Sequence, residues 1–92
     1  MMQTDVEIIN KLGLHVRAAT HLVKLASSFD IDITLSCNGQ TADAKSIMDV
    51  LMLAGTTHTI LRIEASGSSQ EEEDQAIEKI TDLIKNRFYE KE

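Results

Sequence analysis

The chain of 92 residues has no proline, no tryptophan and only one cysteine. A single cysteine, Cys37, excludes an internal disulfide and fits a reducing cytoplasm. Aromatic residues make up only 3% of the chain, so the core must consist of aliphatic side chains. No apolar run has the length of a membrane span or the look of a signal peptide. We therefore expect a cytoplasmic protein that does not insert into a membrane.

Basic residues are also scarce, because nine Lys and Arg stand against fifteen Asp and Glu and give a formal net charge of −6. Nucleic-acid-binding proteins normally carry a basic patch, so no nucleic-acid partner is expected. The histidines and the cysteine lack the spacing of metal ligands, so we predict neither a metal nor another cofactor. A chain of this length fits one domain, and residues 1–92 are taken as a single domain.

The hydrophobic pattern predicts four strands and three helices. Alternating polar and apolar residues indicate half-buried strands, and Asn38-Gly39 is typical of a two-residue hairpin turn. The predicted strands are residues 5–8, 30–37, 40–43 and 60–65. The predicted helices are residues 16–29, 46–53 and 70–84, with Phe88 extending the last by a turn. Because the strands are apolar on one face only, we predict an α+β fold in which helices cover one face of an open sheet.

A histidine stands at the predicted start of the first helix, in the segment Gly13-Leu14-His15, with Arg17 close behind it. The unpaired N–H groups of a first helical turn and the helix dipole favour an anion there. Arg17 adds a permanent positive charge with several directed donors. The imidazole is partly neutral near pH 7 and can attack phosphorus. His15 is therefore predicted to carry a phosphoryl group, the alternative being a surface histidine without a role.

Ser46 is the second candidate, because it has the position of a helix N-cap with Asp49 at the third helical position. Its plain role is to cap the helix. Phosphorylation would add a charge of roughly −1.5 to −2 at a helix N-terminus, where that charge is favourable. Ser46 is thus a candidate regulatory site.

The helix after Ser46 has too many apolar residues for one side to bury. Ile47, Val50 and Leu51 have the spacing of residues that pack on a core. Met48 and Met52 are expected to be exposed, and exposed methionine suits an adaptable docking surface. The alternative is a helix that is tightly buried all round.

These motifs resemble the HPr family, the histidine-containing phosphocarrier proteins of the bacterial phosphotransferase system. The resemblance rests on Gly13-Leu14-His15 with Arg17, on Asn38-Gly39, and on the segment Ala44-Lys45-Ser46-Ile47-Met48. It implies an open-faced β-sandwich of the order β-α-β-β-α-β-α, with a four-stranded antiparallel sheet and three helices on one face.

The resemblance also implies the function. His15 would accept a phosphoryl group on Nδ1 from phosphorylated enzyme I, and would pass it to an enzyme IIA-type acceptor in sugar uptake or its regulation. Arg17 would neutralise the phosphate, and a serine kinase or phosphorylase would act on Ser46. The protein would be a monomeric carrier and a substrate of other enzymes. The implied docking face consists of Leu14, Thr20, Lys24, Ile47, Met48, Leu51 and Met52.

The chain departs from the family at two informative positions. Ala18 stands where the family usually has proline, which should loosen the loop without removing a reacting group. Asp49 places a negative charge near Ser46 and should discourage its phosphorylation or imitate its effect.

Two branches of the HPr family stay open. Asn10-Lys11-Leu12-Gly13 favours the nitrogen-related branch, which is not coupled to sugar transport. The Ser46 motif favours the carriers that are controlled by a serine kinase. Outside the family, the alternatives are a small-ligand-binding regulatory domain and an acyl-phosphate hydrolase. The hydrolase would need an arginine phosphate cradle and a water-positioning amide, and neither is found.

Overall fold

The computed structural model describes residues 1–90 and contains the predicted elements in the predicted order. The strands are β1 (Met2–Glu7), β2 (Asp32–Cys37), β3 (Gln40–Asp43) and β4 (Ile60–Ser66). The helices are α1 (Val16–Ser27), α2 (Ile47–Met52) and α3 (Gln70–Lys85), followed by a short 3-10 turn, η1 (Arg87–Tyr89).

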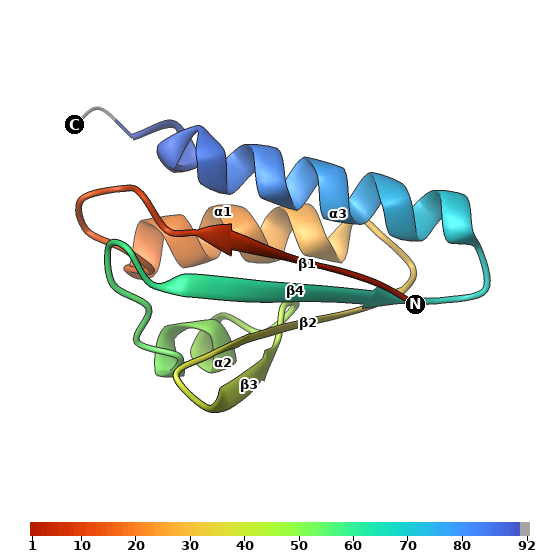
Figure 1. The fold of residues 1–92 in the computed structure, drawn as a ribbon, viewed down its shortest axis with the longest axis horizontal. Coiled ribbons are helices and arrows are strands. Elements are labelled where there is room, and N and C mark those ends of the chain that lie inside the picture. The colour runs from red at the N-terminus through yellow and green to blue at the C-terminus, as the bar shows by residue number, and fades with distance from the viewer. Residues whose placement is uncertain (91–92) are drawn as a thin grey trace.

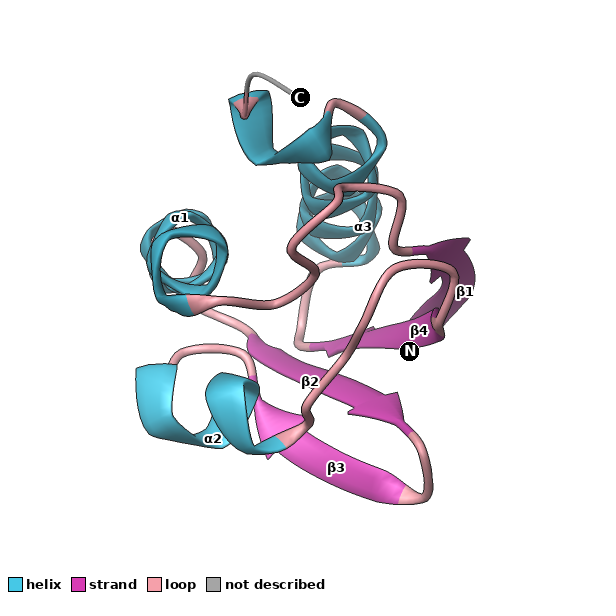
Figure 2. Ribbon diagram, turned by 90° about the vertical axis from the view of Figure 1, so that its left-hand side faces the viewer, coloured by secondary structure: helices cyan, strands magenta, loops and turns pink. Residues whose placement is uncertain are grey.

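The four strands form one antiparallel sheet in the order β1-β4-β2-β3. The central strand β4 pairs with β1 from Met2↔Ala65 to Glu7↔Ile60, and with β2 on its other side. All three helices lie on one face of this sheet, with α3 along β1 and β4, and α2 next to β3 (Figures 1 and 2). The predicted open-faced α+β architecture is confirmed.

The core lies between the sheet and the helices and is almost entirely aliphatic. Alternate residues of each strand face it, as the polar–apolar pattern predicted, and α1 and α3 each contribute one apolar stripe. Phe88 does not extend α3 by a turn, as the sequence had predicted, because its backbone has a positive φ of 54° in η1. Its fully buried side chain closes the core beyond the end of α3. The most buried large side chains are Ile8, Leu22, Ile33, Leu35, Val50, Leu53, Leu61, Ile63, Ile80, Ile84 and Phe88.

Local signals located the turns and caps well. Asn38 and Gly39 both have positive φ, 54° and 77°, as a two-residue hairpin turn requires. Ser46 caps α2 and Ser69 caps α3, each accepting a hydrogen bond from the backbone N–H three residues later.

The boundaries of the first two strands differ from those predicted, because tertiary contacts set them. β1 begins at Met2 because the pairing with β4 continues to that end. β2 begins at Asp32 because Asp30 lies outside the sheet, where its N–H donates to the Glu72 carboxylate over 3.0 Å.

Candidate functional site

The loop before α1 is fixed by close backbone contact with a second loop. Gly13 has φ of +66°, and a Cβ at this position would lie only 2.4 Å from the carbonyl oxygen of Gly55. The N–H of Leu14 donates to that same oxygen over 2.9 Å. Only glycine satisfies both the left-handed conformation and the close approach. The contact between the two loops therefore holds His15, which follows Leu14, in a fixed position over the sheet.

His15 is the N-cap residue of α1, as its position in the sequence predicted. Its backbone is extended, and its carbonyl accepts the N–H of Ala19 over 2.8 Å, while its side chain makes no capping hydrogen bond. The first N–H groups of the helix therefore receive no side-chain cap from it. Arg17 lies in the same turn with an exposed guanidinium. The site offers a helix N-terminus, an exposed cation and an imidazole that is 23% exposed.

A carboxylate from the far end of the chain completes the site. Glu90 Oε2 contacts His15 Nε2 and lies 3.5 Å from an Arg17 guanidinium nitrogen. Glu90 Oε1 accepts a hydrogen bond from the side-chain amide of Asn10 over 2.9 Å. The same buried amide donates to the Gly13 carbonyl over 2.8 Å, so Asn10 joins the C-terminal segment to the loop that carries His15.

The surroundings keep this carboxyl ionised. Burial acts to raise the pKa of Glu90, whose side chain is only 7% exposed. Hydrogen bonds from Asn10 and His15, together with the charges of His15 and Arg17, outweigh that effect and hold the pKa below the ordinary glutamate range. The positive charge of Arg17, which the sequence placed beside His15, thus shares the site with a carboxylate.

Neither Asn10 nor Glu90 was found from the sequence. Glu90 lies 75 residues from His15 along the chain, in an acidic stretch that reads as a solvated tail. The only signal was Phe88, whose apolar character placed the chain near the core just before Glu90. No local sequence pattern predicts which side chain of such a segment reaches the site.

The predicted docking face lies on α1 and α2, which pack side by side (Figure 2). Met48 and Met52 are 67% and 68% exposed, and this excludes the alternative of a wholly buried helix. Ile47 is also exposed, whereas the spacing alone had assigned it to the core. On the α1 side Lys24 is exposed and Thr20 is half-buried, and Leu51 in α2 is half-buried as well.

Leu14 corrects one prediction. It was included in the docking face, but it is 5% exposed and belongs to the core. Its side chain packs close to Gly55, where an added Cβ would lie 2.9 Å from Leu14 Cδ1. Because the loop turns back over Gly55, Leu14 anchors the loop from below and presents no contact surface.

Ser46 stands among carboxylates. Its Oγ accepts the Asp49 N–H at 3.4 Å, and the Asp49 carboxylate in turn accepts the N–H of Asp43 at 3.4 Å. The nearest cation in sequence, Lys45, donates instead to the carbonyl of Phe29 over 2.7 Å. A phosphate on Ser46 would meet negative groups while the neighbouring ammonium is engaged elsewhere.

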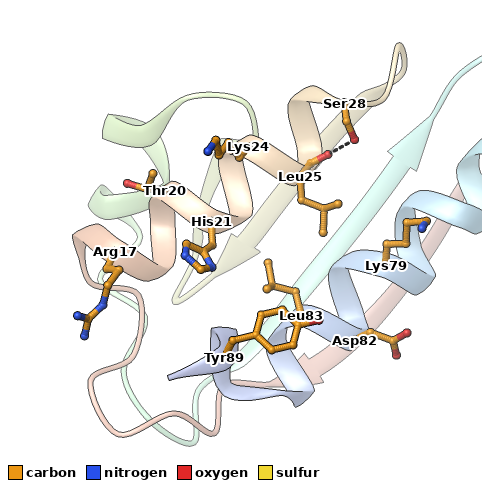
Figure 3. A pocket seen from close by; sticks show the side chains of 10 residues that line it. All are labelled: Arg17, Thr20, His21, Lys24, Leu25, Ser28, Lys79, Asp82, Leu83 and Tyr89. Atoms are coloured by element: carbon orange, nitrogen blue, oxygen red, sulfur yellow. Dashed lines mark hydrogen bonds between the residues drawn. The ribbon is translucent and has the colours of Figure 1, made fainter. Parts of the chain in front are cut away.

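A groove of about 970 Å³ runs between α1 and the α3–η1 segment and begins at Arg17 (Figure 3). Cationic side chains from both helices and the ring of Tyr89 line it. Its lining residues are Arg17, Thr20, His21, Lys24, Leu25, Ser28, Lys79, Asp82, Leu83 and Tyr89.

Within residues 1–90 no three His, Cys, Asp or Glu side chains are gathered closely enough to hold a metal ion. No helix in the described part of the chain is long and apolar enough to cross a membrane.

Comparison with known proteins agrees with the fold. Residues 2–86 match the family model described as the phosphotransferase-system HPr component phosphorylation site. The phosphocarrier protein HPr of Cupriavidus necator is 45% identical over 92 residues and is covered, like this chain, over its full length.

Solved structures show the same architecture. The crystal structure of HPr-C-His from Thermoanaerobacter tengcongensis superposes with a TM-score of 0.91 at 34% identity, with 100% of both chains covered. An HPr dimer from the same organism gives a TM-score of 0.75 at 34% identity, covering 98% of this chain and 100% of that one.

The matched family and the shared open-faced fold place the chain in the class of small phosphocarrier proteins. The chain belongs to the HPr family of the phosphotransferase system. The HPr family works with the enzymes of that system, such as enzyme I and enzyme IIA.

Proposed function

We propose that this protein accepts a phosphoryl group on His15 Nδ1 from phosphorylated enzyme I and passes it to an enzyme IIA-type acceptor. The observation that carries the proposal is the placement of His15 at the uncapped start of α1 beside the exposed Arg17. Among residues 1–90 no hydrogen bond reaches Nδ1, so that nitrogen is available to a donor. The protein acts as a carrier without cofactor, and residues 1–92 work as one domain.

The chemistry needs little from the carrier itself. The lone pair of Nδ1 forms the new N–P bond while the bond between phosphorus and the donor group of enzyme I breaks, and the electron pair of that bond stays with the donor. The first-turn N–H groups of α1 and the guanidinium of Arg17 stabilise the three phosphoryl oxygens. The same P–N bond then breaks in the onward step, because a protonated imidazole is a good leaving group.

We propose that enzyme I and the acceptor use one docking face in turn, formed by α2 and the adjoining side of α1. Its apolar centre is Ile47, Met48 and Met52, with Lys24 at its edge. Exposed methionine adapts to different partner surfaces, which suits a carrier with two partners. Replacing Met48 by alanine should raise the KM for phosphorylated enzyme I and leave the free energy of unfolding unchanged within about 0.5 kcal/mol. The exposed Ile60 on β4 offers a matched control variant.

Regulation through Ser46 stays a proposal of its own, and the carboxylates of Asp43 and Asp49 act against it. Incubation with ATP and a serine kinase tests it directly. Acid-stable phosphate on the native chain that is lost in Ser46→Ala establishes the site, and faster labelling of Asp49→Asn supports inhibition by charge.

The branch of the family is tested by the acceptor. Rapid transfer to a sugar-specific enzyme IIA supports a role in sugar uptake, and transfer to a nitrogen-related enzyme IIA alone supports a regulatory relay. We propose a cytoplasmic monomer. A relative from Thermoanaerobacter tengcongensis has been solved as a dimer, so sedimentation equilibrium of this chain provides the check.

The experiment for the main proposal is incubation with phosphoenolpyruvate and enzyme I. Acid-labile phosphate is expected on the native chain and on His21→Ala, which alters an exposed histidine within α1, and is expected to be absent from His15→Ala. Equal labelling of His15→Ala and native protein would overturn the assignment.

A further inference from the structure

The segment after α3 is held in a conformation that L-amino acids rarely adopt. Arg87, Phe88 and Tyr89 all have positive φ, 54°, 54° and 59°. Non-glycine residues keep such values only where their surroundings over-determine them. The burial of Phe88 is one such constraint, and the N–H of Glu90 donating to the Arg87 carbonyl over 3.0 Å is another. The left-handed turn delivers Glu90 to His15.

Both oxygens of the delivered carboxylate are engaged. Oε1 accepts from the Asn10 amide, and Oε2 contacts His15 Nε2 with Arg17 nearby. The Asn10 amide group faces two acceptors, the Glu90 carboxylate and the Gly13 carbonyl, so this orientation of the amide is the only one that satisfies both. The carboxylate is therefore held in place independently of His15.

The contact determines where the imidazole carries its proton. An ionised carboxylate only accepts hydrogen bonds, so Nε2 must be the donor. In a neutral imidazole the other nitrogen then has the lone pair. The pKa of Glu90 lies below the ordinary glutamate range, which keeps the carboxylate ionised at neutral pH.

We propose that Glu90 is a positioning residue for phosphoryl transfer: it fixes the proton of His15 on Nε2 and thereby leaves the lone pair on Nδ1. This inference rests on the proposed function of His15. Carboxylates orient histidines in this way in other sites, where the partner sets the tautomer and the direction of the ring.

The transfer step is balanced with this arrangement. The Nδ1 lone pair forms the N–P bond, the bond between phosphorus and the donor group breaks, and the donor keeps the electron pair. The Nε2 proton stays on the ring of His15, which gains a positive charge when Nδ1 is phosphorylated. Glu90 stands against that charge and stabilises it, so no other proton acceptor is needed.

The test compares native protein with Glu90→Ala and with the control Glu78→Ala, which removes an exposed carboxylate of α3. Imidazole ¹⁵N chemical shifts report the tautomer of His15 without any phosphorylation. Stopped-flow transfer from phosphorylated enzyme I gives the maximal rate and the KM separately. We expect native protein and Glu78→Ala to hold the Nε2–H tautomer almost completely. Glu90→Ala should show a mixture of tautomers, and its maximal rate should fall about tenfold with an unchanged KM.

Each other outcome overturns the inference, and the measurements show which part of it fails. Unchanged ¹⁵N shifts in Glu90→Ala, or a rate within twofold of the native value, refute the positioning role while leaving His15 as the acceptor. A raised KM with an unchanged maximal rate shows that Glu90 belongs to docking. If native protein is folded and no phosphate is transferred to it, the proposed function fails, and the role of Glu90 fails with it.

Discussion

Replacing Gly13 by alanine should disturb the site much more than its small size suggests. Two effects combine at this position. A non-glycine residue in the left-handed region costs about 1–2 kcal/mol. In addition, the new Cβ would lie 2.4 Å from the Gly55 carbonyl oxygen, well inside the C···O contact distance of about 3.3 Å.

Relief of that contact requires the two loops to separate, and the separation breaks the 2.9 Å hydrogen bond from the Leu14 N–H to Gly55. Loss of a buried backbone hydrogen bond costs about 1–3 kcal/mol. The sum is about 2–5 kcal/mol, a large part of the stability of a domain, which is about 5–15 kcal/mol. The melting temperature should fall by at least about 8 °C, since 1 kcal/mol shifts it by about 4–8 °C in a chain of this size.

Gly39→Ala is the matched control. Gly39 also has a positive φ, +77°, but a Cβ there meets nothing within 4 Å. Urea unfolding should therefore show a loss of only about 1–2 kcal/mol for Gly39→Ala. The difference between the two variants isolates the loop contact. Equal losses, or an unchanged rate of phosphorylation in Gly13→Ala, would refute the claim that the approach to Gly55 positions His15.

Three further predictions concern the rest of the fold. The Gly67 N–H donates a hydrogen bond to the Glu73 carboxylate over 2.8 Å and lowers the pKa of Glu73 against the opposing effect of burial. The stability that this bond contributes is therefore lost as the pH falls through the lowered pKa. Acid unfolding of Glu73→Gln should be less steep than that of the native protein below pH about 4.3. Phe88→Ala should cost about 3–5 kcal/mol in urea unfolding. Ser46→Ala and Ser69→Ala should each lower the free energy of unfolding by about 0.5–1 kcal/mol, measured by calorimetry. An unchanged free energy of unfolding in either variant would show that its serine does not stabilise the helix as a cap.

Features that depend on near neighbours were predictable. The start of α1 at Val16, the Asn38-Gly39 turn and the cap at Ser46 all follow from interactions within three or four residues. The one-sided alternation of the strands predicted the face that the helices cover. These patterns have their physical cause in the adjacent sequence, which explains why they were reliable.

Features that depend on distant residues were not predictable. Glu72 follows the capping-box spacing, yet its carboxylate accepts the N–H of Asp30 across the fold. Leu14 stands next to His15, but its side chain is buried because the loop closes on Gly55. Glu90 reaches His15 only because a left-handed turn reverses the chain after α3. In each case a long-range contact competed with the local pattern and prevailed.

The most direct test of the account is the site of phosphorylation itself. Native protein is phosphorylated by enzyme I with phosphoenolpyruvate, and ³¹P and ¹⁵N spectra are recorded before and after addition of an enzyme IIA-type acceptor. The account predicts one phosphohistidine at His15, bonded through Nδ1, whose signal disappears as the acceptor becomes phosphorylated. A phosphate bonded through Nε2, on another residue, or not passed to any acceptor of the system would contradict it.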